Sequence, residues 1–225
     1  MIVFFEGLDG SGKSSASKLV AEMLRKGGLT VCHTRAPGGT PSAERIRGLL
    51  MGDERLHPDT ILLLFSASAN EQLQFIKEQE EECDVVVCDR WLFSTFAYQL
   101  AMDANPELVT EMIQRVMFTP YDPRLAFYLD ATPEVREQRI YDRDGDKDRF
   151  SSFPQFVRAR MTTNYATMVK AGWLNPVNAN GPLTGVVDDC LERIWRIRDP
   201  ERANGKVAPY TRLKNLPPIE VPKQP

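Results

Sequence analysis

The feature that most constrains the fold of this chain is a glycine-rich segment near its start, Gly7-Leu8-Asp9-Gly10-Ser11-Gly12-Lys13-Ser14. A short apolar run at residues 2–6 precedes it, and residues 14–26 after it place apolar side chains at helical spacing. Glycines allow backbone N–H groups to close around phosphate oxygens, and the N-terminus of the following helix adds a partial positive charge. The segment therefore predicts a phosphate-binding loop between a β-strand and an α-helix.

The pattern G-x-x-x-x-G-K-[ST] predicts the roles of two individual side chains, Lys13 and Ser14. Lys13 is expected to reach the β- and γ-phosphates of a nucleoside triphosphate, and Ser14 to offer its hydroxyl to Mg²⁺. The residues expected to bind the phosphates of ATP are Gly7, Asp9, Gly10, Ser11, Gly12, Lys13, Ser14 and Ser15. Kinases, switch GTPases and ATPase motors share this pattern, so it indicates a triphosphate and magnesium without choosing a reaction.

Strand-like and helix-like segments alternate along the chain. The expected strands cover residues 2–6, 29–34, 84–89, 125–129 and 174–177, and the expected helices cover 14–26, 42–50, 60–82, about 93 onward, 107–118, 133–141, 153–170 and 183–197. The continuous apolar run at 84–89 is typical of a strand buried on both faces. We therefore expect an α/β P-loop NTPase fold, with a five-stranded parallel sheet and helices on both faces. Ligands in such sheets bind at the carboxyl ends of the strands.

Composition excludes several classes of protein. The chain has 225 residues, enough for one compact domain, and a formal net charge of −3, which argues against a nucleic-acid-binding surface. The four cysteines, Cys32, Cys83, Cys88 and Cys190, fit no metal-ligand spacing, so we expect small buried apolar residues in a reduced compartment. No segment has the apolar length that spans a bilayer, and the first residues lack the pattern of a signal peptide. The expected location is the cytoplasm.

A proline-rich tail follows the predicted domain. The domain is expected to cover residues 1–197, and the tail residues 198–225. Prolines recur there with little periodicity, at Pro200, Pro209, Pro217, Pro218, Pro222 and Pro225. Such a composition favours an extended or disordered segment, and a docking role is the alternative.

Three further polar segments follow predicted strands and lie where the site is expected. Residues 34–40 lead to Glu44, Arg45 and Arg47. Residues 89–91 lead to a second polar group at 94–99. The third, at 128–130, precedes a charged stretch from Arg139 to Arg149. All three are expected at the carboxyl edge of the sheet, beside the phosphate loop.

These segments resemble the thymidylate kinase family. The sequence pattern of that family looks like E-G-x-D-G-x-G-K-[ST], then T-R-E-P-G-G-T, then D-R-[YH]-x-x-S-x-x-A-Y-Q, then F-Y-L-D followed by P-E-V. This chain carries similar segments in the same order at residues 6–14, 34–40, 89–99 and 127–135. The resemblance covers about residues 1–197. It implies ATP-dependent phosphorylation of a deoxynucleoside monophosphate, dTMP first, with Mg²⁺, and a homodimer.

The resemblance also implies roles for residues near the acceptor. Asp9 faces the 3′-hydroxyl and the transfer zone, and Arg90 bridges the acceptor and donor phosphates, where a guanidinium neutralises shifting charge. Asp89 joins Ser14 in the magnesium site by orienting a metal-bound water. The remaining residues implied to line the acceptor are Pro37, Arg45 or Arg47 for its phosphate, Phe65 stacked on the base, Ser94, Thr95, Gln99, and Tyr98 as a wall that disfavours a 2′-hydroxyl.

The charged stretch after residue 140 resembles a lid, at about 141–152, that closes over ATP and expels water. Gly10 stands where one subgroup of the family carries an arginine in the phosphate loop. The catalytic arginine is therefore expected from the lid, with Arg149 and Arg143 as candidates. In the helix after the lid, Met161 or Tyr165 is implied to lie near the nucleotide.

This chain departs from the family pattern where the base is read. Ala36 replaces a glutamate, Ala69 an arginine and Gln72 a histidine. Either Asn70, Gln72 or Gln99 then reads thymine, or the accepted base is a different or modified one. A non-catalytic nucleotide-binding protein is a further alternative. A switch GTPase is disfavoured, because no base-reading N-K-x-D follows a strand.

Overall fold

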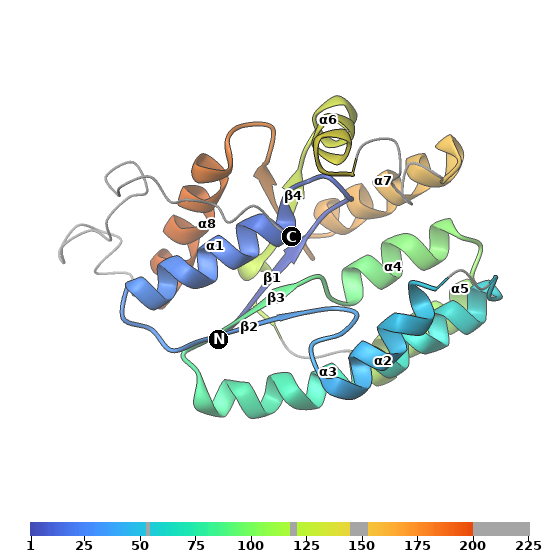
Figure 1. Cartoon of the computed structure of the whole chain (residues 1–225), viewed down its shortest axis with the longest axis horizontal. Coiled ribbons are helices and arrows are strands. Elements are labelled where there is room, and N and C mark those ends of the chain that lie inside the picture. Colours follow the sequence, from blue (N-terminus) through green and yellow to red (C-terminus); the bar gives the residue numbers. More distant parts are fainter. Residues whose placement is uncertain (53–54, 118–120, 145–152, 200–225) are drawn as a thin grey trace.

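A computed structural model describes residues 1–52, 55–117, 121–144 and 153–199 of the chain. Five strands form one parallel sheet in the order β2-β3-β1-β4-β5 (Figure 1). The strands are β1 Ile2–Glu6, β2 Val31–Arg35, β3 Val85–Asp89, β4 Ala126–Asp130 and β5 Asn175–Asn178. The predicted α/β fold and five-stranded parallel sheet are confirmed, and each strand lies within two residues of its expected bounds.

Helices cover both faces of the sheet, as expected. Successive side chains of β1 point to opposite faces of the sheet. Val3 and Phe5 pack in one apolar core, and Ile2 and Phe4 pack in the other. The first core packs under α1 (Lys13–Lys26) and α8 (Leu183–Arg198), which lie side by side in Figure 1. The second core packs under α3 (Pro58–Glu82), α4 (Leu92–Ala101) and α7 (Gln155–Lys170). Because β3 is covered on both faces, its sequence is apolar from Val85 to Cys88.

Short-range signals set the starts of several helices. α2 (Pro41–Leu50) begins after Thr40, whose hydroxyl accepts the backbone N–H of Ala43. α5 (Pro106–Met112) begins after Asn105, whose side chain accepts two backbone N–H groups. Each of these helices has proline in its first turn, where the missing N–H is not needed. The remaining elements are a 3₁₀ turn, η2 (Pro123–Leu125), and α6 (Pro133–Asp144).

The helix expected at residues 107–118 differs from the prediction. Its α-helical part ends at Met112, and one π-helical turn, η1 (Ile113–Met117), follows. Ile113 and Val116 both pack against the core under α3, α4 and α7. Single π-helical turns of this kind occur mostly within α-helices. Residue 118 lies outside the described residues. Within the described part of the chain, none of the helices has the length and apolarity to cross a membrane.

Three other expectations meet the structure only in part. The first residues of the expected lid, 141–144, form the last turn of α6, and residues 145–152 lie outside the described residues. Arg198, assigned to the tail, ends α8 and pairs with Asp84 at 2.6 Å; residues 200–225 are also outside that range. All four cysteines are free thiols, and Cys88 and Cys190 are buried. Cys32 and Cys83 are only half-buried, because one lies on the edge strand β2 and the other follows α3.

Candidate active site

The glycine-rich segment forms the expected loop between β1 and α1. Gly7, Gly10 and Gly12 have φ values of 147°, 79° and 89°, in a region that side chains disfavour. A Cβ added to Gly10 would lie 2.5 Å from the carbonyl oxygen of Arg136 on α6. Position 10 therefore has no space for a side chain while α6 lies against the loop.

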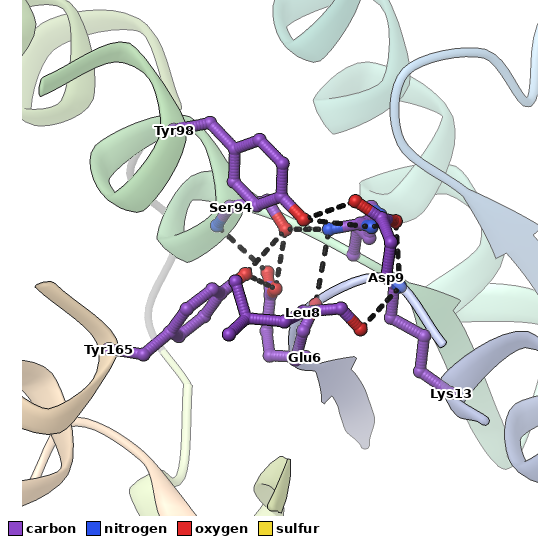
Figure 2. A network of polar contacts seen from close by, with 9 residues as sticks. Glu6, Leu8, Asp9, Lys13, Ser94, Tyr98 and Tyr165 are labelled. Atoms are coloured by element: carbon purple, nitrogen blue, oxygen red, sulfur yellow. Dashed lines mark hydrogen bonds and ion pairs between the residues drawn. The ribbon is translucent and has the colours of Figure 1, made fainter. Parts of the chain in front are cut away.

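Lys13 and the serines occupy different environments at the start of α1. Lys13 is buried, and its Nζ donates to the carbonyl of Leu8 at 3.3 Å and to Oδ1 of Asp9 at 3.4 Å (Figure 2). Burial and the nearby Arg90 charge lower the pKa of Lys13. Ser14 and Ser15 are exposed. The hydroxyl of Ser11 is buried and has no partner among the described residues, so it is available to a ligand in the loop.

Asp89 ends β3 and carries a polar atom that the described protein does not satisfy. Its Oδ1 is buried and has no hydrogen-bond partner within the described ranges. The described residues hold no cluster of three or more His, Cys, Asp or Glu side chains that could cage a metal. Magnesium, however, usually binds through one or two protein groups, phosphates and several waters. The carboxylate of Asp89 and the exposed hydroxyl of Ser14 are donors of the kind that magnesium binds in this way.

Asp9 is the centre of a charged network. Its Oδ1 pairs with Arg90 and Lys13, and its Oδ2 accepts the hydroxyl of Tyr98 at 2.6 Å (Figure 2). Burial raises the pKa of Asp9, but the charges of Arg90 and Lys13 outweigh burial and lower it to about 2. Asp9 is therefore a carboxylate throughout the ordinary pH range. It joins the phosphate loop to the turn after β3.

Arg90 lies in that turn with a backbone φ of 70°, which is unusual for a residue other than glycine. Its N–H donates to the carbonyl of Phe5 at 2.9 Å, so β1 holds the turn. Its guanidinium donates to the carbonyl of Gly7 at 3.3 Å and to Oγ of Ser94 at 2.9 Å. It also stacks over the ring of Tyr98, 5.2 Å from the centroid. The guanidinium is thus fixed beside the phosphate loop.

The network contains two residues whose roles the sequence reasoning missed or left open. Glu6 is fully buried, and its carboxylate accepts hydrogen bonds from Trp91, Ser94 and Tyr165. Burial raises the pKa of Glu6. Of the two candidates on α7, Tyr165 joins this network, whereas Met161 packs in the apolar core. The signals of this arrangement were a glutamate at the end of an otherwise apolar strand and its place at the start of the segment at residues 6–14.

The turn at residues 34–40 is held from α2. The Glu44 carboxylate accepts hydrogen bonds from Nε and Nη2 of Arg35 and from the backbone N–H of Gly39. The peptide bond before Pro37 is cis, and the Pro37 carbonyl accepts Nη1 of Arg47 at 3.0 Å. Arg45 is exposed, whereas Arg47 is half-buried. The two expected phosphate-binding arginines therefore face different directions, and Arg47 is the one that adjoins the turn.

Helices α3 and α4 supply the expected base-binding side chains. Phe65 is half-buried on α3, one turn before the buried Ala69. Gln72 is buried, and its Nε2 donates to Oγ1 of Thr34 at 3.2 Å. Gln99 is completely buried, and neither its amide oxygen nor its amide nitrogen has a partner among the residues described. Two other expected residues of α4, Ser94 and Thr95, are also buried.

Helix α6 places an arginine, Arg139, against the phosphate loop, and the sequence analysis did not propose this residue for the site. Arg139 donates to the carbonyl of Ser11 at 3.3 Å and to that of Gly181 at 3.0 Å. It thus joins the loop to the segment after β5. Arg143 lies exposed in the last turn of α6, and Arg149 lies outside the described residues. Arg139 lies four residues before Arg143, on the same face of the helix, so this spacing could have identified it.

Comparisons with known proteins agree with this geometry. A family model described as "Thymidylate kinase" matches residues 5–190. A curated thymidylate kinase of Ruegeria pomeroyi is 33% identical over 197 residues, which cover 85% of this chain and 93% of that protein. A curated thymidylate kinase of Dinoroseobacter shibae is 36% identical over 190 residues, which cover 83% of this chain and 87% of that protein.

A solved structure gives the same result for the fold. The crystal structure of thymidylate kinase from Ehrlichia chaffeensis superposes with a TM-score of 0.66 at 26% sequence identity. The match covers 88% of this chain and 98% of the other. Similarity therefore extends over the sheet, its helices and the loop edge that carries the site.

Proposed function

Because this chain belongs to the thymidylate kinase family, we propose that it transfers the γ-phosphate of ATP to dTMP, forming ADP and dTDP. The observation that carries the proposal is the pairing of Asp9 with Arg90 beside the phosphate loop. The loop and Lys13 suit the triphosphate donor, and Arg90 reaches the same point from the next strand of the sheet. A site with both features brings two phosphate groups together.

The transfer proceeds in line, without a covalent enzyme intermediate. The phosphate of dTMP is itself the nucleophile, so positioning and charge neutralisation lower the barrier. Arg90 donates to the oxygens of both phosphates as charge shifts between them. Lys13 leaves its contacts with Leu8 and Asp9 and turns to the β- and γ-phosphates when ATP fills the loop. Asp9 holds Arg90 and accepts the 3′-hydroxyl of the acceptor sugar.

Ser14 and Asp89 are the residues that would hold Mg²⁺, which supplies charge neutralisation on the β- and γ-phosphates when bound. The support is the exposed hydroxyl of Ser14 at the start of α1 and the unsatisfied buried Oδ1 of Asp89. Asp89 acts through water, because magnesium dehydrates reluctantly.

The acceptor lies between α2, α3 and α4. Arg47, rather than the exposed Arg45, binds its phosphate, and Phe65 stacks on its base. Tyr98 limits the space for a 2′-hydroxyl, because Asp9 fixes its ring in place. Pro37, Ser94 and Thr95 complete the wall. The donor side is covered by α6, where Arg139 anchors the helix to the loop, and Arg143 and Arg149 are the arginines proposed to reach the transferring group.

The base is read by Gln99, the amide whose two polar atoms both lack partners in the described protein. Gln72 contributes less, because its nitrogen already binds Thr34, and Asn70 is exposed. An amide presents both a donor and an acceptor, so it can pair with thymine or with another pyrimidine. A second or modified pyrimidine nucleotide is therefore the alternative acceptor.

A coupled assay of ADP release tests the proposed function. ATP, Mg²⁺ and the enzyme are mixed with dTMP, dUMP, dCMP, dAMP or dGMP in turn. We expect turnover with dTMP, and Arg90→Ala should lower kcat by on the order of a thousandfold. Turnover with another pyrimidine alone would establish the alternative acceptor. No ADP release with any nucleotide would reject the kinase in favour of a nucleotide-binding protein.

The chain forms a homodimer, in keeping with the expectation from its resemblance. The support is a group of exposed apolar side chains on and beside α2 and α3, namely Leu49, Met51 and Leu63. Light scattering at micromolar concentration should give twice the mass of 25.5 kDa. Leu63→Asp should yield the single mass if this face is the interface. The cytoplasmic location stays a prediction.

A further inference from the structure

Glu6 is a completely buried carboxylate at the end of β1, adjacent to the phosphate loop. Its Oε1 accepts the backbone N–H of Trp91 at 2.6 Å and of Ser94 at 3.2 Å. Its Oε2 accepts the hydroxyls of Ser94 at 2.6 Å and Tyr165 at 2.8 Å. Figure 2 shows Ser94 and Tyr165 pointing at Glu6 from different helices. Four donors thus compensate a carboxylate that burial alone would make costly.

Two of these bonds fix the start of α4. Trp91 is the N-cap residue, yet no side chain of its own caps the helix, and the first turn has no acidic residue. Glu6 therefore supplies from β1 the oxygen and the negative charge that a helix N-terminus favours. The residue before this N-cap is Arg90, whose φ of 70° turns the chain out of β3. Glu6 holds the backbone directly after that turn.

The other contact leads to the Arg90 side chain. Ser94 donates its hydroxyl hydrogen to Glu6 and accepts Nη1 of Arg90 at 2.9 Å. While Glu6 takes that hydrogen, Ser94 keeps its lone pairs for the guanidinium of Arg90 and for the Tyr165 hydroxyl, which lies 2.9 Å from its Oγ. A group at position 6 that donated to Ser94 would compete with Arg90 for them. The direction of one hydroxyl thus depends on the charge state of Glu6.

We propose that Glu6 is a positioning residue for phosphoryl transfer, which sets the turn and the guanidinium of Arg90 through Trp91 and Ser94. The proposal rests on the proposed function, because it concerns how Arg90 is held for that reaction. Glu6 itself touches neither nucleotide.

Glu6→Gln tests this role with little change in shape. The amide oxygen still accepts the two backbone N–H groups, but the NH₂ group donates to Ser94 and Tyr165 where Oε2 accepted. We expect kcat to fall about tenfold to a hundredfold, with KM for ATP changed by no more than roughly twofold and the thermal midpoint nearly unchanged. Wild-type kcat with a folded Glu6→Gln protein would overturn the proposal.

The pH profile of kcat separates positioning from a structural role. The charged and titratable groups around Glu6 are Arg90, Lys13, Cys88 and Tyr165. Burial raises the pKa of Glu6. As pH is lowered, wild-type kcat should therefore begin to fall at a pH higher than the ordinary pKa of a glutamate. The fall in kcat that is due to Glu6 should be missing in Glu6→Gln. A fall that is due to protonation of the nucleotide phosphate should remain in both proteins. Superimposable profiles would contradict the proposal.

Asp84→Asn is the matched control. Asp84 accepts the backbone N–H of Thr30 at 2.9 Å and pairs with Arg198 at 2.6 Å, at the opposite end of β3. Its loss removes a bonded carboxylate without touching the site, so kcat should stay at the wild-type value. A fall equal to that of Glu6→Gln would show a general effect of lost carboxylates and overturn the proposal.

Ser94→Ala completes the test. If Glu6 acts through Ser94, the double variant Glu6→Gln/Ser94→Ala should lose no more kcat than the single variant with the larger loss. Losses that multiply would reject the path through Ser94. Should Glu6→Gln fail to fold, Ser94→Ala alone must still lower kcat, by about tenfold, in a folded protein. Normal kcat in Arg90→Ala would refute the proposed function, whereas loss there with normal kcat in Glu6→Gln refutes only this inference.

Discussion

The hydroxyl of Tyr98 donates a hydrogen bond of 2.6 Å to Oδ2 of Asp9, while the other oxygen of the same carboxylate pairs with Arg90. Tyr98 comes from the second turn of α4, Asp9 from the phosphate loop and Arg90 from the turn after β3. Three separate elements are thereby locked together at one carboxylate. The transfer geometry consequently depends on a residue, Tyr98, that carries no charge in the reaction.

Tyr98→Phe should therefore reduce turnover without removing any group that contacts ATP. The ring and its stacking on Arg90 remain, but Asp9 loses one charge-assisted hydrogen bond. We expect kcat/KM for dTMP to fall about tenfold, with KM for ATP unchanged. Steady-state kinetics in each substrate provide the measurement. Tyr121→Phe is the control, because that hydroxyl donates at 3.3 Å to the carbonyl of Trp173, away from the site.

The low pKa of Asp9 gives the free energy of unfolding a defined pH dependence. Burial raises this pKa, and Arg90 and Lys13 lower it to about 2, from an ordinary value of 3.8. The stabilisation is therefore fully present above pH 3.8 and is lost as pH falls toward 2. By linkage it amounts to about 2 kcal/mol.

Asp9→Asn should remove that dependence. Urea unfolding of both proteins between about pH 5 and 2.5 gives the difference in free energy at each pH. Other carboxylates with lowered pKa, such as Glu44, contribute equally to both curves and cancel. A constant difference over this range would show that Asp9 has the same pKa in the folded and unfolded chains.

Sequence patterns predicted the sheet well because burial dictates composition. Helices cover both faces of β3, so its residues from Val85 to Cys88 are buried and apolar, and only the last residue, Asp89, is polar. The phosphate loop was predictable because glycine positions follow from backbone geometry alone. The role of Glu6 was not, since its partner Tyr165 lies 159 residues away and no local pattern joins them.

Two other features lay beyond sequence reasoning for related reasons. Arg45 and Arg47 are separated by about 200° around α2, so only one of them faces the turn, but periodicity does not say which. The packing of α2 against α3 settles that Arg47 adjoins Pro37. The left-handed backbone of Arg90 is imposed by β1, through Phe5 and Glu6, against the residue's own preference.

Asp89→Asn should weaken the response to Mg²⁺ more than it weakens the maximal rate. The amide keeps an oxygen but loses the charge that holds a metal-bound water. We expect the Mg²⁺ concentration for half-maximal activity to rise about tenfold, with kcat largely restored at saturation. A titration of MgCl₂ at fixed ATP measures it. Asp130→Asn, at the exposed end of β4, should leave the titration unchanged.

Gln99→Leu should affect stability and binding in opposite directions. Both polar atoms of the Gln99 amide are buried without partners in the described protein, so an apolar side chain of similar size costs the fold nothing and can stabilise it. If the amide reads the base, KM for dTMP should nevertheless rise about tenfold to a hundredfold. Gln72→Leu is the matched contrast, because it breaks the bond to Thr34 and should lower the thermal midpoint. Unchanged KM in a stabilised Gln99→Leu protein would assign the base to another side chain.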